Sequence, residues 1–206
     1  MSPTATSLSS STDPRLDRWL GRLLETPGLT AIRDPAAARR VHLEESLIAV
    51  SHLDRFQGSI ADVGSGGGAP GIPIAAALPE REVVLLEANA RKCEFLESVA
   101  RDFPNVRVQR GRAEEAGTDH LGAAVAKALA PPPVALEWCL PLVAIGGAVI
   151  LYAGPSADAG AVARVSALLG GGIPEEFPGL LVVRKLEPTP PGFPRRPGIA
   201  QKRPLS

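Results

Sequence analysis

Residues 62–73 read DVGSGGGAPGIP, and this stretch decides the fold of the chain. Glycines spaced this closely let the backbone turn sharply, and they let a ligand approach closer than a Cβ atom would allow. The stretch lies between two apolar segments, and an acid, Glu87, ends the next apolar run at residues 83–86. The order of strand, glycine loop, helix, strand and acid is typical of a nucleoside-binding α/β unit.

Two kinds of nucleoside-binding loop can be fitted to these glycines. The dinucleotide fingerprint G-x-G-x-x-G/A falls on Gly64, Gly66 and Ala69. The pattern D-x-G-x-G-x-G, typical of loops that bind S-adenosylmethionine, falls on Asp62 and on Gly64, Gly66 and Gly68. A glycine-rich turn without any ligand is the third interpretation.

The prolines of the stretch favour S-adenosylmethionine. A dinucleotide loop is already helical at its third small residue, so that its amides point at the pyrophosphate. Here Pro70 disfavours the helical conformation at Ala69, and Pro73 is tolerated only in a first helical turn. We therefore expect the helix to begin near Ile72, after a loop longer than a dinucleotide requires.

Length and composition limit the possible architectures and partners. The chain has 206 residues, enough for one α/β domain with a sizeable core and short extensions. Its 22 basic and 22 acidic residues cancel, so the total charge favours no particular partner. Cys93 and Cys139 show no disulfide or metal spacing, and free thiols fit a reducing cytosol. We expect a cytoplasmic monomer without a metal site.

The chain divides into three segments by pattern. Residues 1–12 are rich in Ser and Thr and lack the features of a secretory signal, so we expect a disordered tail. Residues 13–57 predict an N-terminal helical extension. It has one helix over residues 13–25 and another that begins at Asp34-Pro35 and runs to about Phe56. Residues 58–206 predict the S-adenosylmethionine-binding domain.

Strands and helices alternate in this last segment. Strands are expected near residues 60–64, 83–87, 106–109, 123–126 and 147–152, and helices near 72–78, 90–102, 132–142 and 158–169. Continuous apolar strands between helices indicate a parallel sheet that is covered on both faces. Residues 180–186 predict a last antiparallel pair, which gives a doubly wound, mostly parallel, seven-stranded, Rossmann-like sheet.

The most apolar stretch, residues 138–154, approaches the length of a membrane span. Pro141 and Gly146-Gly147 interrupt it. We therefore interpret it as a helix end, a turn and a buried strand, and we expect no membrane contact.

Candidate binding residues follow the ends of three predicted strands. Glu87 ends the second strand, where a carboxylate can accept both ribose hydroxyls of an adenosine. Residues 111–115 follow the third strand, where a backbone amide and an acid can read an adenine ring. Lys127 closes the fourth strand. It could reach a cofactor carboxylate or an RNA phosphate, or be a surface lysine with a buried stem.

The sequence predicts no catalytic side chain. The sulfonium methyl group of S-adenosylmethionine is already activated. A neutral ring nitrogen, if it is the acceptor, attacks with a lone pair without first losing a proton, so alignment and desolvation can supply the rate. The chain has no Ser-His-Asp arrangement and no Asn-Pro-Pro-Tyr loop, which would have indicated an exocyclic amine as the acceptor.

Several motifs together resemble the RsmG (GidB) family of methyltransferases. The most specific is the Pro-Gly-Ile-Pro ending of the glycine loop. The others are LTAIRDP at 29–35, His42 with Glu45-Ser46, Arg91-Lys92 with Phe95-Leu96, GRAE at 111–114, EWCLPL at 137–142 and PRRPG at 194–198. The resemblance covers residues 29–205. It implies a class I methyltransferase that uses S-adenosylmethionine to methylate guanine N7 in bacterial small-subunit (16S) ribosomal RNA.

The resemblance also implies functional positions. Those that would contact the cofactor are Gly64, Ala69, Ala113, Glu114 and Lys127. For the RNA, we expect a basic surface made of Arg91, Lys92, Arg195, Arg196, Lys202 and Arg203. The predicted partner is 16S ribosomal RNA or the small ribosomal subunit.

The chain also departs from the family pattern. Lys127 and Val41 stand where the family usually has Arg, Ala153 stands where it has Lys, and Gly28 stands where it has Asn. Several of these changes are losses of a cation, and cations hold phosphates. The cofactor side therefore matches the family better than the RNA side does. The alternatives are a methyltransferase of another RNA or of a small molecule, a weakened member that only binds cofactor and RNA, and a nicotinamide-dependent reductase.

Overall fold

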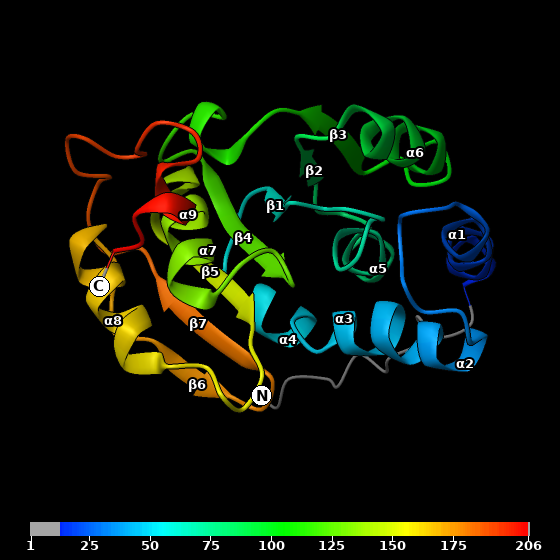
Figure 1. Ribbon diagram of the computed structural model, residues 1–206, viewed down its shortest axis with the longest axis horizontal. Helices are drawn as coiled ribbons and strands as arrows, with labels where there is room; N and C mark the ends of the chain where they lie inside the picture. Colours follow the sequence, from blue (N-terminus) through cyan, green and yellow to red (C-terminus); the bar gives the residue numbers. More distant parts are fainter. Residues whose placement is uncertain (1–12, 206) are drawn as a thin grey trace.

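The glycine loop joins the first strand of a seven-stranded sheet to a helix (Figure 1). The structure is a computed structural model that describes residues 13–205. The tail predicted for residues 1–12 lies outside the described residues.

The sheet has the strand order β3-β2-β1-β4-β5-β7-β6. The strands are β1 (Ile60–Val63), β2 (Val83–Glu87), β3 (Val106–Arg110), β4 (Leu121–Lys127), β5 (Val143–Tyr152), β6 (Glu175–Phe177) and β7 (Leu180–Arg184). β1 to β5 run parallel, β7 pairs antiparallel with β5, and β6 pairs antiparallel with β7. The expected doubly wound, mostly parallel sheet is confirmed. The order reverses beside β1, which places a ligand crevice at its carboxyl end.

Helices cover both faces of the sheet. The main ones are α1 (Pro14–Glu25), α5 (Gly71–Ala77), α6 (Ala90–Ala100), α7 (Pro132–Cys139), α8 (Ala159–Leu168) and α9 (Ile199–Lys202). Side chains of α1, α5 and α6 share one core cluster with one face of the sheet, and those of α7, α8 and α9 share a second cluster with the other face. Short 3-10 helices, η3 (Ala113–Glu115) and η4 (Leu140–Leu142), follow β3 and α7.

Local sequence accounts for most of these boundaries. Asp13, Asn89 and Asp158 cap α1, α6 and α8, because each side chain accepts a hydrogen bond from a backbone amide of the first turn. β1 and β2 are buried along their whole length, as expected for strands covered on both faces. The apolar stretch at 138–154 forms the end of α7, η4 and β5. Within residues 13–205, no helix is long and apolar enough to cross a membrane.

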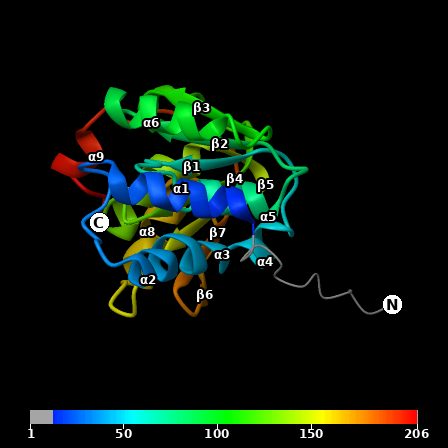
Figure 2. The same cartoon turned by 90° about the vertical axis from the view of Figure 1, so that its right-hand side faces the viewer.

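The N-terminal extension packs on the same face as α5. Figure 2, which looks onto this side, shows α1 and α2 in front of the sheet. Leu16, Trp19 and Leu23 of α1 are buried in one core cluster together with Ile60 of β1 and Leu85 of β2. The extension therefore completes the core of the sheet rather than forming a core of its own.

The single helix predicted from Asp34 to Phe56 is wrong. This segment is divided into α2 (Pro35–Ala38), a π-helix η2 (Arg39–Glu44), α3 (Glu45–Leu47) and α4 (Val50–Leu53). Side chains from distant strands donate hydrogen bonds to carbonyl groups of this segment. The Lys127 ammonium donates to the Val41 carbonyl, and the Tyr152 hydroxyl donates to the Ser46 carbonyl. The Ser46 hydroxyl donates to the His42 carbonyl at 2.8 Å. Such competition for the main chain widens the helix locally.

Two glycine substitutions test how tightly the sheet is packed. A Cβ atom on Gly122 in β4 would lie 1.7 Å from the Gln57 carbonyl oxygen, whereas one on Gly21 in α1 would meet no atom within 4 Å. We expect Gly122→Ala to destabilise the fold by about 1–3 kcal/mol, because the backbone would have to move to make room for the methyl group. The control Gly21→Ala should stabilise it by about 0.5–1 kcal/mol. Urea unfolding measures both changes, and effects of the same sign would contradict the packing described.

Candidate cofactor-binding site

The glycine loop has a left-handed backbone at alternate positions. The φ angles are 71° at Gly64, 56° at Gly66 and 99° at Gly68. These values are accessible to glycine and strained for other residues. The loop is closed by a hydrogen bond from the Gly68 amide to the Ser65 carbonyl oxygen at 2.7 Å. α5 then begins at Gly71, close to the expected position near Ile72.

Asp62 holds the loop from below. Its side chain is buried, and its Oδ2 accepts a hydrogen bond from the Gly71 amide at 2.9 Å. Burial raises the pKa of this carboxyl to about 7. Asp62 therefore joins the end of β1 to the start of α5. It supports the loop from within the core.

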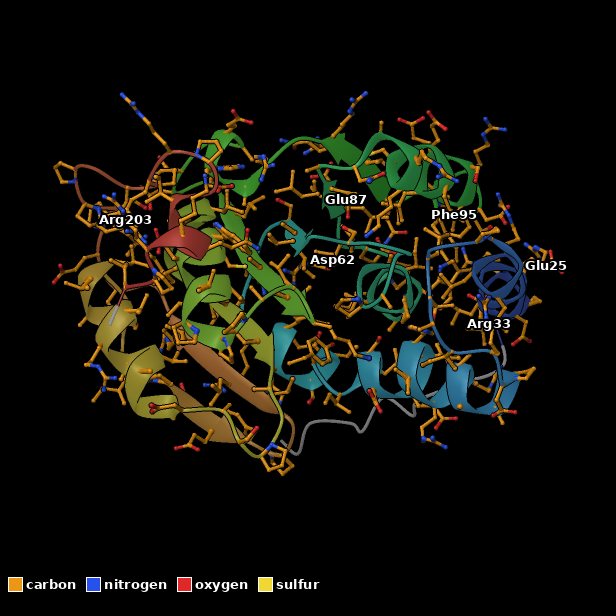
Figure 3. The ribbon with its side chains drawn as sticks, viewed as in Figure 1. Glu25, Arg33, Asp62, Glu87, Phe95 and Arg203 are labelled. Carbon is orange, nitrogen blue, oxygen red and sulfur yellow. The ribbon has the colours of Figure 1, made fainter. Side chains whose placement is uncertain are left out.

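Glu87 holds the loop from the side. Its Oε2 accepts a hydrogen bond from the Gly66 amide at 2.9 Å, and its Oε1 accepts one from the Asn89 amide at 2.8 Å. The residue is 8% exposed and lines the cavity at the carboxyl ends of the strands. Figure 3 labels it at the end of β2. Each carboxylate oxygen keeps further acceptor capacity, so Glu87 can bind hydroxyl groups while the loop holds it in place.

A cavity of about 300 Å³ opens at the carboxyl ends of β1 and β2. It combines apolar walls with a few polar groups, which is the composition of a small-molecule site. Its lining residues are Val63, Gly64, Leu86, Glu87, Ala88, Lys92, Gly111, Arg112, Ala113, Glu114, Ala128, Leu129, Trp138 and Gln201. Glu87 and the Ala113–Glu114 segment, which we expected to hold the ribose and the adenine of S-adenosylmethionine, are both among these residues.

The structure brings only some of the predicted cofactor residues to the cavity. Gly64, Glu87, Ala113 and Glu114 line it. Asp62, Gly66, Gly68, Ala69 and Lys127 do not. Gly66 and Gly68 shape the loop, and Ala69 packs against the core beneath it.

Lys127 points toward the N-terminal extension. Its ammonium is 3.2 Å from Glu45 Oε2, donates to the Val41 carbonyl, and lies 5.6 Å from the centroid of the Tyr152 ring. Burial lowers the pKa of Lys127. It also lowers the pKa of His42, and the Lys127 charge adds to this effect. The cation is therefore committed to contacts within the protein.

The predicted RNA-binding cations fall into two groups around the cavity. Lys92 on α6 lines it, and Arg91 is exposed beside it. Arg196, Lys202 and Arg203 are exposed, and none of the three forms an ion pair with any of residues 13–205. Arg195 differs, since its guanidinium forms a bidentate ion pair at 2.5 Å with the buried carboxylate of Glu137.

Several cavity residues were missing from the sequence predictions. Arg112 is exposed at the cavity, next to the predicted Ala113. Leu129, Trp138 and Gln201 come from segments that only the tertiary structure brings together. Trp138 belongs to a motif that carried the family resemblance, but nothing in the motif indicated that it lines the cavity. Within residues 13–205, no three His, Cys, Asp or Glu side chains are grouped to hold a metal ion.

Comparison with known proteins gives consistent matches. A family model named GidB, described as rRNA small subunit methyltransferase G, matches residues 17–176. A ribosomal RNA small subunit methyltransferase G from Synechococcus elongatus is 36% identical over 198 residues, which cover 86% of this chain and 82% of that protein. One from Thermotoga neapolitana is 37% identical over 210 residues, which cover 91% and 89%.

Solved structures share the fold. A 16S rRNA N2 G1207 methyltransferase from T. thermophilus, in complex with AdoMet and guanosine, aligns with a TM-score of 0.54 and 16% identity over 74% of this chain and 42% of that one. The O-methyltransferase TomG from Streptomyces achromogenes, in complex with SAM, aligns with a TM-score of 0.53 and 20% identity over 88% and 93%. These likenesses show the class I methyltransferase fold.

Removal of the Glu87 carboxylate should weaken the cofactor. We expect Glu87→Ala to reduce the affinities for S-adenosylmethionine and S-adenosylhomocysteine equally, by about 1–3 kcal/mol, because both ligands contain the ribose. Isothermal titration calorimetry measures both affinities. Glu97→Ala, on the exposed side of α6, is the matched control and should change neither. A loss for only one of the two ligands would remove Glu87 from the ribose site.

The raised pKa of Asp62 predicts a pH-dependent stability. The unfolded carboxyl ionises near its ordinary pKa of 3.8, whereas the folded one keeps its proton up to about pH 7. The contribution of Asp62 is thus complete below pH 3.8 and is lost as the pH rises through about 7. Asp62→Asn cannot titrate and keeps an acceptor for the Gly71 amide. The melting temperature of the wild type should therefore fall relative to that of Asp62→Asn as the pH rises from about 4 to about 7. A constant difference would contradict the assignment.

Proposed function

The chain belongs to the GidB family, rRNA small subunit methyltransferase G, and from this premise we infer that it methylates guanine N7 of 16S ribosomal RNA with S-adenosylmethionine. The observation that carries this inference is the cavity beside β1. Gly64 of the left-handed glycine loop and the Glu87 carboxylate line it, together with the cations Lys92 and Arg112.

Different residues of the cavity bind different parts of the cofactor. The Glu87 carboxylate receives the ribose hydroxyls, and the Ala113 amide with the Glu114 carboxylate faces the adenine. Leu129 covers Gly64, since a Cβ atom on Gly64 would lie 2.3 Å from Leu129 Cδ1. The absence of a Cβ atom on Gly64 therefore leaves room for the Leu129 side chain at this wall of the cavity.

The chemistry requires no general base. When bound, S-adenosylmethionine supplies a methyl group on a positively charged sulfur. Guanine N7 has a free lone pair, so no proton has to leave before the new bond forms. The contribution of the protein is to align the two groups and exclude water, and we assign no catalytic side chain.

The RNA surface surrounds the mouth of the cavity. In the view of Figure 3, Glu87 lies between Arg203 and Phe95 of α6, the helix that carries Arg91 and Lys92. We propose that Arg91, Lys92, Arg196, Lys202 and Arg203 bind phosphates on both sides of the target guanine, and Arg112 extends this surface. We further propose a cytoplasmic monomer with a helical extension at 13–57 and a methyltransferase domain at 58–206.

Nucleoside mass spectrometry tests the proposed reaction. The purified protein, S-adenosylmethionine and small ribosomal subunits from a strain that lacks this gene are incubated together, and the 16S RNA is digested to nucleosides. We expect 7-methylguanosine to form, and Glu87→Ala to slow its formation. A different methylated nucleoside would show that another atom is the acceptor. The proposal would be overturned if neither the subunits nor naked RNA became methylated.

The exposed cations should determine the salt dependence of RNA binding. Each phosphate contact releases counterions from the RNA, so a variant with fewer contacts depends less on salt. We expect the double variant Arg196→Ala with Arg203→Ala to flatten the slope of the log-log plot of 16S RNA affinity against salt by about one to two units. The cofactor affinity should stay the same. Arg55→Ala with Arg184→Ala, exposed at the opposite edge of the sheet, is the matched control. Equal slopes for both double variants would remove residues 196 and 203 from the RNA surface.

A further inference from the structure

The ends of four neighbouring strands form one row at the carboxyl edge of the sheet. Lys127 pairs with Tyr152 in the register of β4 with β5. The registers of β1 with β2 and with β4, continued to the strand ends, place Gly64 between Glu87 and Lys127. Because neighbouring strands lie about 4.8 Å apart, the backbone of Lys127 is about 10 Å from that of Glu87. We call Glu87, Gly64, Lys127 and Tyr152 the strand-end row.

The cofactor accounts for only one half of the strand-end row. In the proposed binding mode, the adenine faces Ala113 and Glu114 after β3, and the ribose faces Glu87 at the end of β2. The sulfonium is bonded to the ribose, so the methyl group lies farther along the row, toward β1 and β4. The acceptor base must therefore approach from the side of Lys127 and Tyr152.

The backbone directly after Lys127 is strained. Ala128 has a φ angle of 53°, which is unfavourable for a residue with a Cβ atom. The residue is exposed, and it lines the cavity. Strained positions of this kind cluster at functional sites. The strain and the exposure of Ala128 both indicate that the Lys127 side of the cavity has a function of its own.

A carboxylate from the N-terminal extension is held at this end of the strand-end row. Glu45 follows the π-helix η2, and its Oε2 lies 3.2 Å from the Lys127 ammonium. The Lys127 side chain is 13% exposed, whereas that of Glu45 is 47% exposed. Lys127 also donates to the Val41 carbonyl, and Tyr152 donates to the Ser46 carbonyl. The ends of β4 and β5 thus fix the segment that presents the Glu45 carboxylate to the solvent.

We propose that Glu45 recognises the acceptor guanine and that Lys127 positions Glu45. Guanine carries two adjacent donors, N1–H and N2–H, on its Watson–Crick edge. A carboxylate has lone pairs for both, even while one of its oxygens contacts Lys127. N7 lies on the other edge of the base, so a guanine held in this way keeps N7 free to face the methyl group.

The same contact would reject adenine. Adenine has an acceptor at N1 and no group at C2, so its ring nitrogen would face a carboxylate without a proton between them. This inference rests on the proposed function, because it names how the guanine of that reaction is held.

Two substitutions of one side chain test the recognition. Glu45→Gln has nearly the same shape but loses the charge and turns an N–H group toward the guanine donors. We expect it to slow 7-methylguanosine formation in small ribosomal subunits by about 10–100-fold in single turnovers at saturating S-adenosylmethionine. Glu45→Asp keeps the carboxylate and should recover most of the rate.

The controls separate recognition from a structural role. Glu44→Gln changes the exposed neighbour on η2, and adjacent helical residues do not share a face, so it should methylate at the wild-type rate. Glu45→Gln should keep the wild-type melting temperature and the wild-type affinity for S-adenosylhomocysteine, because Glu45 is not a lining residue of the cofactor cavity.

The outcomes distinguish this inference from the proposed function. If the wild type forms 7-methylguanosine and Glu45→Gln forms it equally fast, recognition by Glu45 is overturned and the proposed function stands. A slow Glu45→Gln that also binds S-adenosylhomocysteine more weakly or melts earlier would assign Glu45 a structural role and overturn the inference. If the wild type forms no 7-methylguanosine, the proposed function is overturned, and the inference that rests on it is overturned as well.

Discussion

The site depends on a glycine loop that two carboxylates hold by its backbone amides. Asp62 accepts from Gly71 where α5 begins, and Glu87 accepts from Gly66 within the loop and from Asn89 behind β2. Because both acids sit at the carboxyl ends of adjacent strands, the sheet itself sets the geometry of the loop. A left-handed backbone is thereby kept in one conformation, and an acceptor for a ribose is presented beside it. Every other wall of the cavity is placed relative to this unit.

The opposite side of the cavity is built by chain segments that have no local reason to meet. Leu129 comes from the loop between β4 and α7, Trp138 from α7, and Gln201 from α9. The buried pair of Glu137 and Arg195 explains how the last of these is held there. The segment that carries Gln201 also displays exposed cations toward the solvent, so the cofactor cavity and the proposed RNA surface share one element.

The sheet and half of the cofactor site could be predicted from the sequence, and the reasons are local. Strand and helix periods, caps and the glycine pattern act over a few residues, so the mostly parallel sheet and the location of Gly64, Glu87, Ala113 and Glu114 followed from them. The helix predicted up to Phe56 failed because Lys127 and Tyr152, remote in sequence, take carbonyls of that segment. No periodicity of residues 34–56 contains that information.

The sequence alone determined the class of fold, the position of the nucleoside crevice and the family, since these depend on short-range pattern and on motifs read in order. Tertiary structure alone decided what the charged side chains do. Asp62 became a buried support, Lys127 turned to the N-terminal extension, and Arg195 paired with Glu137 instead of remaining among the surface cations. The physical reason is desolvation: a charge is committed to whichever partner the fold buries beside it, and burial is a property of the whole chain.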